Sequence, residues 1–128
     1  MRQLQRVLLV EDDPDVRAVT DFALRSVGGF SVEVCASAQE ALERAEAFAP
    51  DLILLDVMMA GIDGPAALRA LREIPSLVTT PVVFVTAKIQ PQEVARYKAM
   101  GSLGVIGKPF DPTTLTETLH AIWEQQGS

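Results

Sequence analysis

The sequence predicts an α/β fold, a flavodoxin-like doubly wound parallel sheet of five strands in the order 2-1-3-4-5 with five helices. Two observations predict it. Short aliphatic runs alternate with amphipathic helical patterns, and the central runs are almost continuously apolar, as in strands that helices cover on both faces. With 128 residues, 48% of them hydrophobic, the chain can bury one sizeable core. We therefore expect a single domain over residues 1–128, with its core at about residues 6–123.

Runs rich in β-branched or aliphatic residues are the predicted strands. They cover residues 7–10, 31–35, 52–55, 82–85 and 103–106. Because helical patterns separate these runs, right-handed crossovers place the strands parallel in one sheet. Ligands bind such sheets beyond the carboxyl ends of the strands, where the winding direction reverses, here between the first and third strands. We therefore expect the chemistry of the protein at that edge.

The first helix is expected to begin at Pro14, because proline favours the first helical position and Asp13 before it is a good N-cap. Gly28 and Gly29 are expected to end it. Apolar residues recur at helical spacing and predict one buried face, made up of Val16, Val19, Ala23 and Val27. Core packing is the expected role of Val16 and Val19, and a partner-facing patch beside the site, together with Leu4, is the alternative.

The other helices also carry start and stop signals. The second opens with a capping box, in which Ser37 is followed three residues later by Glu40, and it ends before Pro50. Prolines mark the remaining starts. The third helix is expected between Pro65 and Pro75, the fourth between Pro91 and Met100, and the fifth from Asp111 and Pro112 onward.

The charge balance limits the partners of the domain. The 17 acidic and 11 basic residues give a net charge of −6 and a pI near 4.7, which argues against direct nucleic-acid binding. No segment is long and apolar enough to span a membrane, and the N-terminal residues lack a signal-peptide pattern. Cys35 is the single cysteine and is expected to be a small apolar filler. We therefore expect a cytoplasmic protein without membrane contact.

Acidic residues follow two of the predicted strands at the expected edge. Glu11, Asp12 and Asp13 come after the first strand, and Asp56 follows the third. Taken singly, an aspartate at such a place is more often a helix cap or a loop residue. Together they form a cluster of like charges that is costly unless a cation lies among them. Oxygen ligands suit Mg²⁺, with Mn²⁺ as a second candidate and the backbone carbonyl of Met58 as an additional ligand.

The two neighbouring strands add a hydroxyl and an ammonium group to that edge. Thr86 ends the fourth strand, and Lys108 follows the fifth. A threonine at a strand end is usually present for its β-branched shape, and only the nearby acids favour a chemical role for this one. An aspartate carboxylate can attack phosphorus when a metal ion and a lysine neutralise the phosphoryl oxygens. The four strands therefore bring the groups that such a reaction needs to one edge of the sheet.

Four stretches of the chain, in order, resemble the receiver domain of bacterial two-component response regulators. They are VLLVEDDPDVR, PDLILLDVMMAGIDG, PVVFVTA and GKPF. One such stretch is a weak signal, but four in the family's order are specific, and the resemblance covers residues 6 to about 123. It implies a phosphoacceptor switch in a His-to-Asp phosphorelay. Such a domain catalyses its own phosphorylation and dephosphorylation without an external substrate, so it is not an enzyme in the usual sense.

The same resemblance implies a role for each residue of the site. Glu11 and Asp12 would hold Mg²⁺, and Asp56 would be both a metal ligand and the phosphoacceptor. Thr86 would supply the hydroxyl that moves toward the phosphoryl group. Lys108 would be the cation that contacts that group.

The resemblance also implies partners. A sensor histidine kinase or a phosphotransfer protein would donate the phosphoryl group. The output would be a downstream protein target or an effector domain, because no effector segment follows the fifth helix in this sequence. The chain would therefore be a stand-alone regulator or a receiver cut from a longer one. Homodimerisation on phosphorylation is a further implication.

Other positions of the sequence either agree with the family pattern or depart from it. In the family the Lys108–Pro109 peptide bond is cis, which proline makes accessible. Val105 stands where an aromatic switch residue is usual, so its coupling to the threonine is in question. Ala60 stands where proline is common and is expected only to loosen its loop. Met58 and Lys88 occupy places that, by the resemblance, govern access of the hydrolytic water.

Three other functions compete with this interpretation. A phosphatase of the haloacid dehalogenase type also uses an aspartate nucleophile and Mg²⁺, but it needs a second aspartate where this chain has Met58. A flavodoxin-like cofactor binder needs a first loop rich in Ser, Thr and Gly, and here that loop is acidic. A receiver-type docking or dimerisation module that works without phosphorylation is the third. The departures at Val105 and Ala60 favour it mildly, and the intact acids and Lys108 oppose it.

Other prominent side chains have structural roles as their expectation. His120, the only histidine, is expected on the surface of the fifth helix rather than in catalysis. Trp123 is expected to pack against the core or an interface. Arg69 and Arg72 are expected on a solvated face of the third helix.

Overall fold

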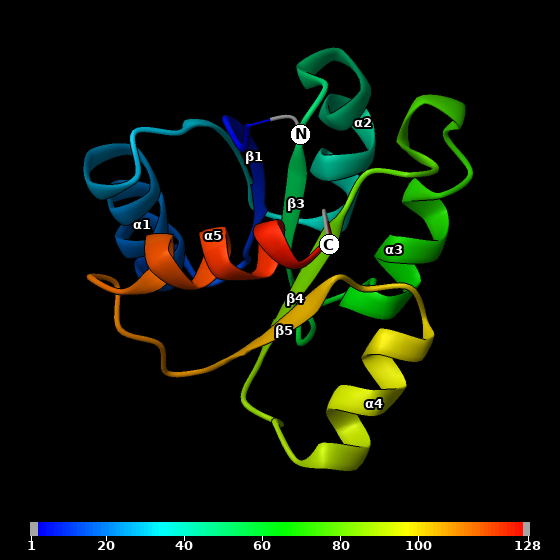
Figure 1. The fold of residues 1–128 in the computed structure, drawn as a ribbon. Helices are drawn as coiled ribbons and strands as arrows, with labels where there is room; N and C mark the ends of the chain where they lie inside the picture. Colours follow the sequence, from blue (N-terminus) through cyan, green and yellow to red (C-terminus); the bar gives the residue numbers. More distant parts are fainter. Residues whose placement is uncertain (1–2, 127–128) are drawn as a thin grey trace.

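The computed structural model describes residues 3–126, so Met1, Arg2, Gly127 and Ser128 of the predicted domain lie outside it. Within that range five parallel strands form one sheet in the order β2-β1-β3-β4-β5, and helices cover both faces (Figure 1). The predicted fold class and strand order are confirmed. The strands are β1 Arg6–Val10, β2 Ser31–Cys35, β3 Leu52–Asp56, β4 Val82–Thr86 and β5 Gly104–Gly107. The helices are α1 Pro14–Phe22, α2 Ala38–Phe48, α3 Gly64–Leu71, α4 Pro91–Ala99 and α5 Leu115–Gln125, with the short turns η1 Ala23–Val27 and η2 Pro75–Leu77.

The two faces of the sheet bury separate hydrophobic clusters, because successive residues of a strand point to opposite sides. On one face, α2, α3 and α4 pack over a cluster that includes Leu8, Ile53 and Phe84. On the other face, η1 and α5 pack over a cluster that includes Leu9 and Leu54. β3 and β4 are buried along their whole length, as predicted for central strands.

The buried face of the first helix differs from the predicted one. It is centred on Thr20, Ala23 and Leu24, while Val19 is 50% exposed and Val27 is exposed as well. A polar residue can be buried here because the Thr20 hydroxyl donates to the carbonyl four residues earlier at 2.6 Å. The core role predicted for Val19 is therefore wrong, and an apolar side chain is left at the surface of α1.

The end of this helical segment depends on Gly28 and Gly29, as predicted. The backbone widens into η1, a π-helical turn in which the Gly28 amide donates to the carbonyl of Ala23, five residues back, at 3.2 Å. A Cβ at Gly28 would lie 2.7 Å from the Phe30 ring, which leaves room for glycine only. Gly29 has a φ of +70°, a conformation that glycine adopts without strain.

The second helix begins with the predicted capping box in a shifted form. Ser37 Oγ accepts a hydrogen bond from the Glu40 amide at 3.1 Å. The Glu40 carboxylate reaches back to the amide of Ala36 at 3.0 Å, one residue before the cap. α2 ends before Pro50, at Ala49, which has a φ of +54°.

Among residues 3–126, no helix has the length and apolarity that a membrane crossing requires.

The third helix is shorter than predicted. α3 ends before Pro75 is reached, and Pro75 begins η2 instead of closing the helix. Arg72 holds the following segment, because its guanidinium donates to the carbonyls of Leu77 at 2.7 Å and Thr80 at 2.6 Å. Burial lowers the pKa of Arg72. The predicted solvated role of Arg72 is therefore wrong, whereas Arg69 is exposed as expected.

The fifth helix begins later than predicted. The carboxylate of Asp111 accepts hydrogen bonds from the amide of Thr113 at 2.9 Å and from its hydroxyl at 2.7 Å, which close a turn and delay the helix. These bonds lower the pKa of Asp111. Within α5, Trp123 is buried as predicted. His120 is half-buried on the helix, with its ring centroid 5.6 Å from that of Phe30.

Candidate functional site

β1 and β3 end side by side and carry acidic residues to one edge of the sheet. Their register pairs Val10 with Leu55, so Glu11 and Asp56 follow at neighbouring positions. The amide of Glu11 donates to the carbonyl of Cys35 at 3.1 Å, which extends the contact between β1 and β2 by one residue. Glu11 is only 3% exposed and Asp56 only 2%. The strand geometry thus holds two carboxylates in a buried position, next to the half-buried Asp12.

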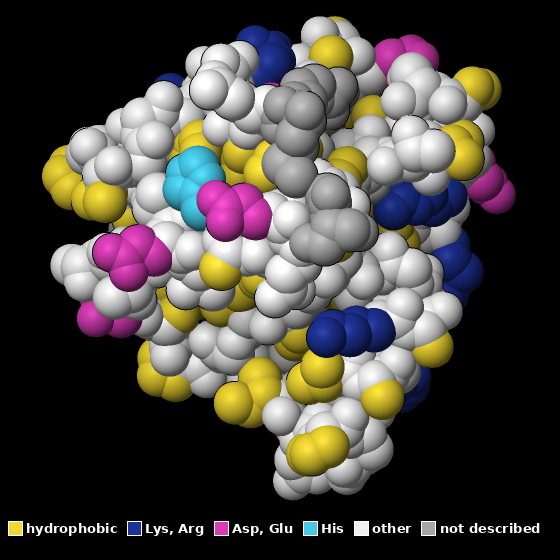
Figure 2. Space-filling model, viewed as in Figure 1, with side chains coloured by type: hydrophobic (Ala, Val, Ile, Leu, Met, Phe, Trp, Pro, Cys, Tyr) yellow, Lys and Arg dark blue, Asp and Glu magenta, His cyan; other side chains and the backbone are white. Residues whose placement is uncertain are grey.

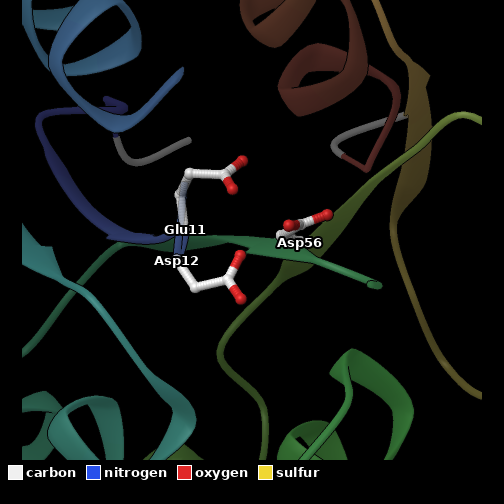
Figure 3. Close-up of side chains that lie close together, drawn as sticks. All are labelled: Glu11, Asp12 and Asp56. Carbon is white, nitrogen blue, oxygen red and sulfur yellow. The ribbon is translucent and has the colours of Figure 1, made fainter. Parts of the chain in front are cut away.

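The three acids that end these strands form a cluster. Carboxylate oxygens of Glu11, Asp12 and Asp56 lie within 4.8 Å of one another, and the three side chains point into a common space (Figure 3). Hard oxygen donors at this separation are the ligands that Mg²⁺ and Mn²⁺ accept, so the residues fit the expected ion. The Met58 amide donates to Asp56 Oδ1 at 3.3 Å, and the role of the Met58 carbonyl as a ligand stays a prediction.

Lys108 places its ammonium group between two of these acids. Its Nζ lies 3.0 Å from Oε1 of Glu11 and 3.1 Å from Oδ1 of Asp56. The backbone amide of Lys108 donates to the carbonyl of Thr86 at 2.8 Å, which holds the end of β5 against β4. The Lys108–Pro109 peptide bond is cis, as the resemblance implied. The structure therefore brings the lysine and the acids together from three strands.

Burial and neighbouring charge both act on Asp56. Burial raises the pKa of Asp56 to about 6, the Glu11 carboxylate adds to that rise, and Lys108 opposes it. Burial disfavours the ammonium of Lys108, but its hydrogen bonds to Glu11 and Asp56 outweigh that cost and raise the pKa of Lys108. One lysine among three acids leaves negative charge uncompensated in a largely buried place. This is the electrostatic condition that favours binding of a cation.

Thr86 ends β4 and is 1% exposed, with its backbone in register with Gly107 of β5. Its Oγ1 accepts a hydrogen bond from the amide of Lys88 at 3.1 Å, so the hydroxyl engages the β4–α4 loop. A Cβ at Gly107 would lie 2.9 Å from Cγ2 of Ile89, so the glycine leaves room for this loop to lie against β5. Val105 packs against the cluster that α2, α3 and α4 cover.

Three groups that fix the acids were not predicted for that role. The Asp13 amide donates to Glu11 Oε2 at 3.1 Å. Arg17 Nη1 donates to the carbonyls of Glu11 at 3.1 Å and Asp12 at 3.4 Å. The Ala60 amide donates to Asp12 Oδ2 at 2.9 Å. Arg17 lies within the first stretch that resembles the family, and its charge beside the acids could have indicated a role at the site. The amides of Asp13 and Ala60 could not have been found in this way, because every residue except proline has a backbone amide. The expectation that Ala60 only loosens its loop overlooked this bond.

Gly64, at the start of α3, lies directly against the end of β3. Its amide donates to the carbonyl of Val57 at 2.9 Å, and a Cβ there would lie 2.6 Å from the carbonyl oxygen of Asp56. Only glycine permits this approach. Asp63 caps the helix, because its carboxylate accepts from the Ala66 amide at 2.9 Å. The short loop after Asp56 therefore returns to the sheet at the site itself.

The doubly wound sheet, with acids and a lysine where its winding reverses, defines a receiver-type signalling domain. The family model of the response regulator receiver domain matches residues 7–120. The chemotaxis response regulator CheY4 of Vibrio cholerae matches with a TM-score of 0.85 at 32% identity, covering 94% of this chain and 99% of that one. A response regulator from Desulfuromonas acetoxidans matches with a TM-score of 0.81 at 26% identity, covering 94% and 98%. The chain belongs to the response regulator receiver domain family.

Curated relatives agree with this assignment and are longer. The response regulator Rre1 of Synechocystis sp. is 33% identical over 120 residues, which are 94% of this chain and 52% of the relative. The transcriptional regulatory protein CseB of Streptomyces avermitilis is 33% identical over 127 residues, 99% of this chain and 52% of the relative. The chain thus spans about half the length of these relatives. It is a signalling module rather than a metabolic enzyme.

Proposed function

We propose that this chain is the phosphoacceptor switch of a two-component His-to-Asp phosphorelay and that Asp56 is the residue that receives the phosphoryl group. The observation that carries the proposal is the Lys108 ammonium, 3.1 Å from Asp56 Oδ1, beside the clustered carboxylates. The proposed donor is a sensor histidine kinase or a phosphotransfer protein. Mg²⁺, with Mn²⁺ as an alternative, is the proposed cofactor, held by Glu11, Asp12, Asp56 and the carbonyl of Met58.

Asp56 acts as the nucleophile in this proposal. One of its carboxylate oxygens forms a bond to phosphorus while the bond from phosphorus to the donor's imidazole nitrogen breaks, and that nitrogen leaves with the electron pair. A bound divalent ion would supply positive charge for the phosphoryl oxygens. The Lys108 ammonium already contacts Asp56, so it can turn to the phosphoryl group that forms there. With a pKa of about 6, Asp56 is mostly ionised at neutral pH, as a nucleophile must be.

Phosphorylation would add negative charge, about one unit, that needs new hydrogen-bond donors. The hydroxyl of Thr86 and the amide of Ala87 are the proposed donors. If Thr86 Oγ1 turns toward the phosphoryl group, its bond to the Lys88 amide is lost and the β4–α4 loop is released. The surface formed by α4, β5 and α5 would change as a result and present the output.

A groove beside the site offers the donor a place to dock. Its lining includes Val16, Val19 and Phe110, which come from α1 and the segment after β5, and its volume is about 410 Å³. Lys108 also lines it, so the groove leads toward the acids. Hydrophobic side chains reach the surface around α1 and α5 on the face that Figure 2 shows. We propose this groove as the docking place for the histidine-bearing segment of the donor.

The output partner is proposed to be a separate target protein or an effector domain. The transcriptional regulators among the relatives are about twice the length of this chain. With its net charge of −6, this domain is not proposed to contact nucleic acid itself. Homodimerisation on phosphorylation and residence in the cytoplasm are part of the proposal, and so is self-catalysed dephosphorylation.

Intact-mass spectrometry after incubation with acetyl phosphate tests the proposal. The expected result is one phosphoryl adduct that requires Mg²⁺, is released by hydroxylamine and is absent from Asp56→Asn. The variant is a matched control because it keeps the shape of the side chain and removes the nucleophile. Absence of an adduct in folded protein that binds Mg²⁺ would instead favour a docking module that works without phosphorylation.

A further inference from the structure

The loop between β4 and α4 covers residues 87–90, and all of these residues are exposed (Figure 1). A hydrogen bond and an apolar contact connect it to the sheet. The Lys88 amide donates to Oγ1 of Thr86 at 3.1 Å, and the side chain of Ile89 lies over the backbone of Gly107 in β5. We infer that Ile89 is a positioning residue for Thr86, which holds the loop and the threonine hydroxyl in their unphosphorylated arrangement. The inference rests on the proposed function, in which Thr86 responds to the phosphoryl group.

The contact between Ile89 and β5 depends on the absence of a side chain at position 107. A Cβ at Gly107 would lie 2.9 Å from Cγ2 of Ile89 and 3.1 Å from its Cδ1. Carbon atoms in favourable contact are about 3.5 to 4.0 Å apart, so a larger residue would push the isoleucine away from the strand. Gly107 is in register with Thr86. Ile89 therefore packs on the strand position beside the threonine that it is inferred to hold.

Ile89 lies on the face of β5 that turns toward α4. Val105 and Gly107 are two residues apart in the strand, so they share a face of the sheet. Val105 packs against the cluster that α2, α3 and α4 cover. It is therefore engaged with the core, whereas Ile89 belongs to the loop and moves with it. Ile89 is the apolar side chain through which β5 responds to the loop.

The partial exposure of Ile89 suits a contact that has to break. Ile89 is 56% exposed, whereas Thr86 is 1% exposed. Because apolar burial stabilises in proportion to the area removed from water, the half-covered isoleucine holds the loop only weakly. New hydrogen bonds to a phosphoryl group can then outweigh this contact. The isoleucine thus sets how readily the hydroxyl of Thr86 leaves the Lys88 amide.

Two substitutions remove the contact from opposite sides. Ile89→Ala removes the side chain, and Gly107→Ala fills the space against which it packs. Gly104→Ala is the matched control, because it makes the same change in the same strand but on the other face, where its Cβ would lie 3.1 Å from Ile122 of α5. Ile89→Ala changes an exposed residue, so it tests the inference even if Gly107→Ala does not fold.

Amide hydrogen exchange of Lys88, measured by NMR on the unphosphorylated full chain, is the first test. We expect Ile89→Ala and Gly107→Ala each to speed this exchange about fivefold, because the bond to Thr86 opens more often. The double variant should exchange no faster than either single variant, because both substitutions remove the same contact. Gly104→Ala should stay within about twofold of the wild type.

Amides of β3 exchange by global unfolding and provide the internal control. In Ile89→Ala their rates should stay within about twofold of the wild type, so that faster exchange of Lys88 reports the loop alone. Exchange of Lys88 that is the same in Ile89→Ala as in the wild type would overturn the inference. Effects of Ile89→Ala and Gly107→Ala that add in full in the double variant would also overturn it.

Excess acetyl phosphate with Mg²⁺ separates this inference from the proposed function. Intact mass should show an adduct in the wild type and in Ile89→Ala, because Ile89 is not proposed to contact the phosphoryl group. The adduct should speed exchange of Lys88 about fivefold in the wild type but less than about twofold in Ile89→Ala, where the loop is already released. Equal increases in both proteins would contradict the inference. Absence of an adduct in the wild type would overturn the proposed function, and exchange in the unphosphorylated variants would still decide whether Ile89 holds the loop.

Discussion

Two buried aspartates lie at opposite ends of β3 and differ in the groups that surround their carboxylates. Asp51 precedes β3 and is 8% exposed, and its Oδ2 accepts hydrogen bonds from the amides of Gln5 at 3.0 Å and Arg6 at 2.8 Å. Asp56 ends the strand, where burial and, to a smaller extent, a second carboxylate raise its pKa to about 6. The first accepts hydrogen bonds from backbone amides at the start of β1. The second is held beside a like charge, at the end of the sheet that we propose as the functional one.

This contrast predicts that removing Asp51 destabilises the protein most. Asp51→Ala would leave two part-buried amides without their acceptor, at a cost of about 2 to 3 kcal/mol in the free energy of unfolding. Asp51→Asn keeps one carbonyl oxygen and should cost about 1 kcal/mol. Urea unfolding at pH 7 measures both. If Asp51→Ala leaves the free energy of unfolding almost unchanged, water replaces the carboxylate as the acceptor. The proposed difference between the two ends of β3 would then be contradicted.

At the other end, Asp56→Asn should stabilise the protein without Mg²⁺. The folded pKa of Asp56 is about 6, above the ordinary aspartate pKa of 3.8. The folded state therefore binds more protons between these values, and the stability of the wild type falls as pH rises through that window. After allowance for solvent screening, the variant should gain about 1 to 2 kcal/mol above pH 7 and little at pH 4. Urea unfolding from pH 4 to pH 8 measures this difference. Destabilisation at pH 7 would mean that attraction to Lys108 outweighs burial and repulsion.

Added Mg²⁺ should change the free energy of unfolding by the smallest amount, and it should act only at the Asp56 end of β3. At about five times its Kd, the ion should raise the free energy of unfolding by about 1 kcal/mol, because it binds the folded state. Asp51→Asn should keep this increase and Asp56→Asn should lose most of it. Thermal unfolding with and without MgCl₂ makes the comparison. Equal increases in both variants would place the ion elsewhere.

The fold could be predicted because its signals lie in the types of residue and their order along the chain. Apolar runs such as β3 and β4 could be recognised because helices cover both of their faces. The convergence of Glu11 and Asp56 followed from the rule that ligands bind at the carboxyl ends of parallel strands. These features depend on residue type and order alone.

The errors came from contacts that residue type does not show. Thr20 is buried because its hydroxyl bonds within the helix, and this shifts the buried face away from Val19. Arg72 was expected in solvent and instead holds two carbonyls of a later turn. Ala60 acts through its backbone. Each depends on a partner that only the folded chain supplies.

Cys35, at the end of β2, has a practical consequence. Its side chain is fully buried, and burial raises the pKa of the thiol to about 11, so little reactive thiolate forms at neutral pH. A new cysteine placed on the exposed side of α4, for example at Lys98, would react with maleimide dyes while Cys35 stays silent. The natural sequence is therefore already suited to single-site fluorescent labelling, and a dye on α4 would follow the proposed switch in real time.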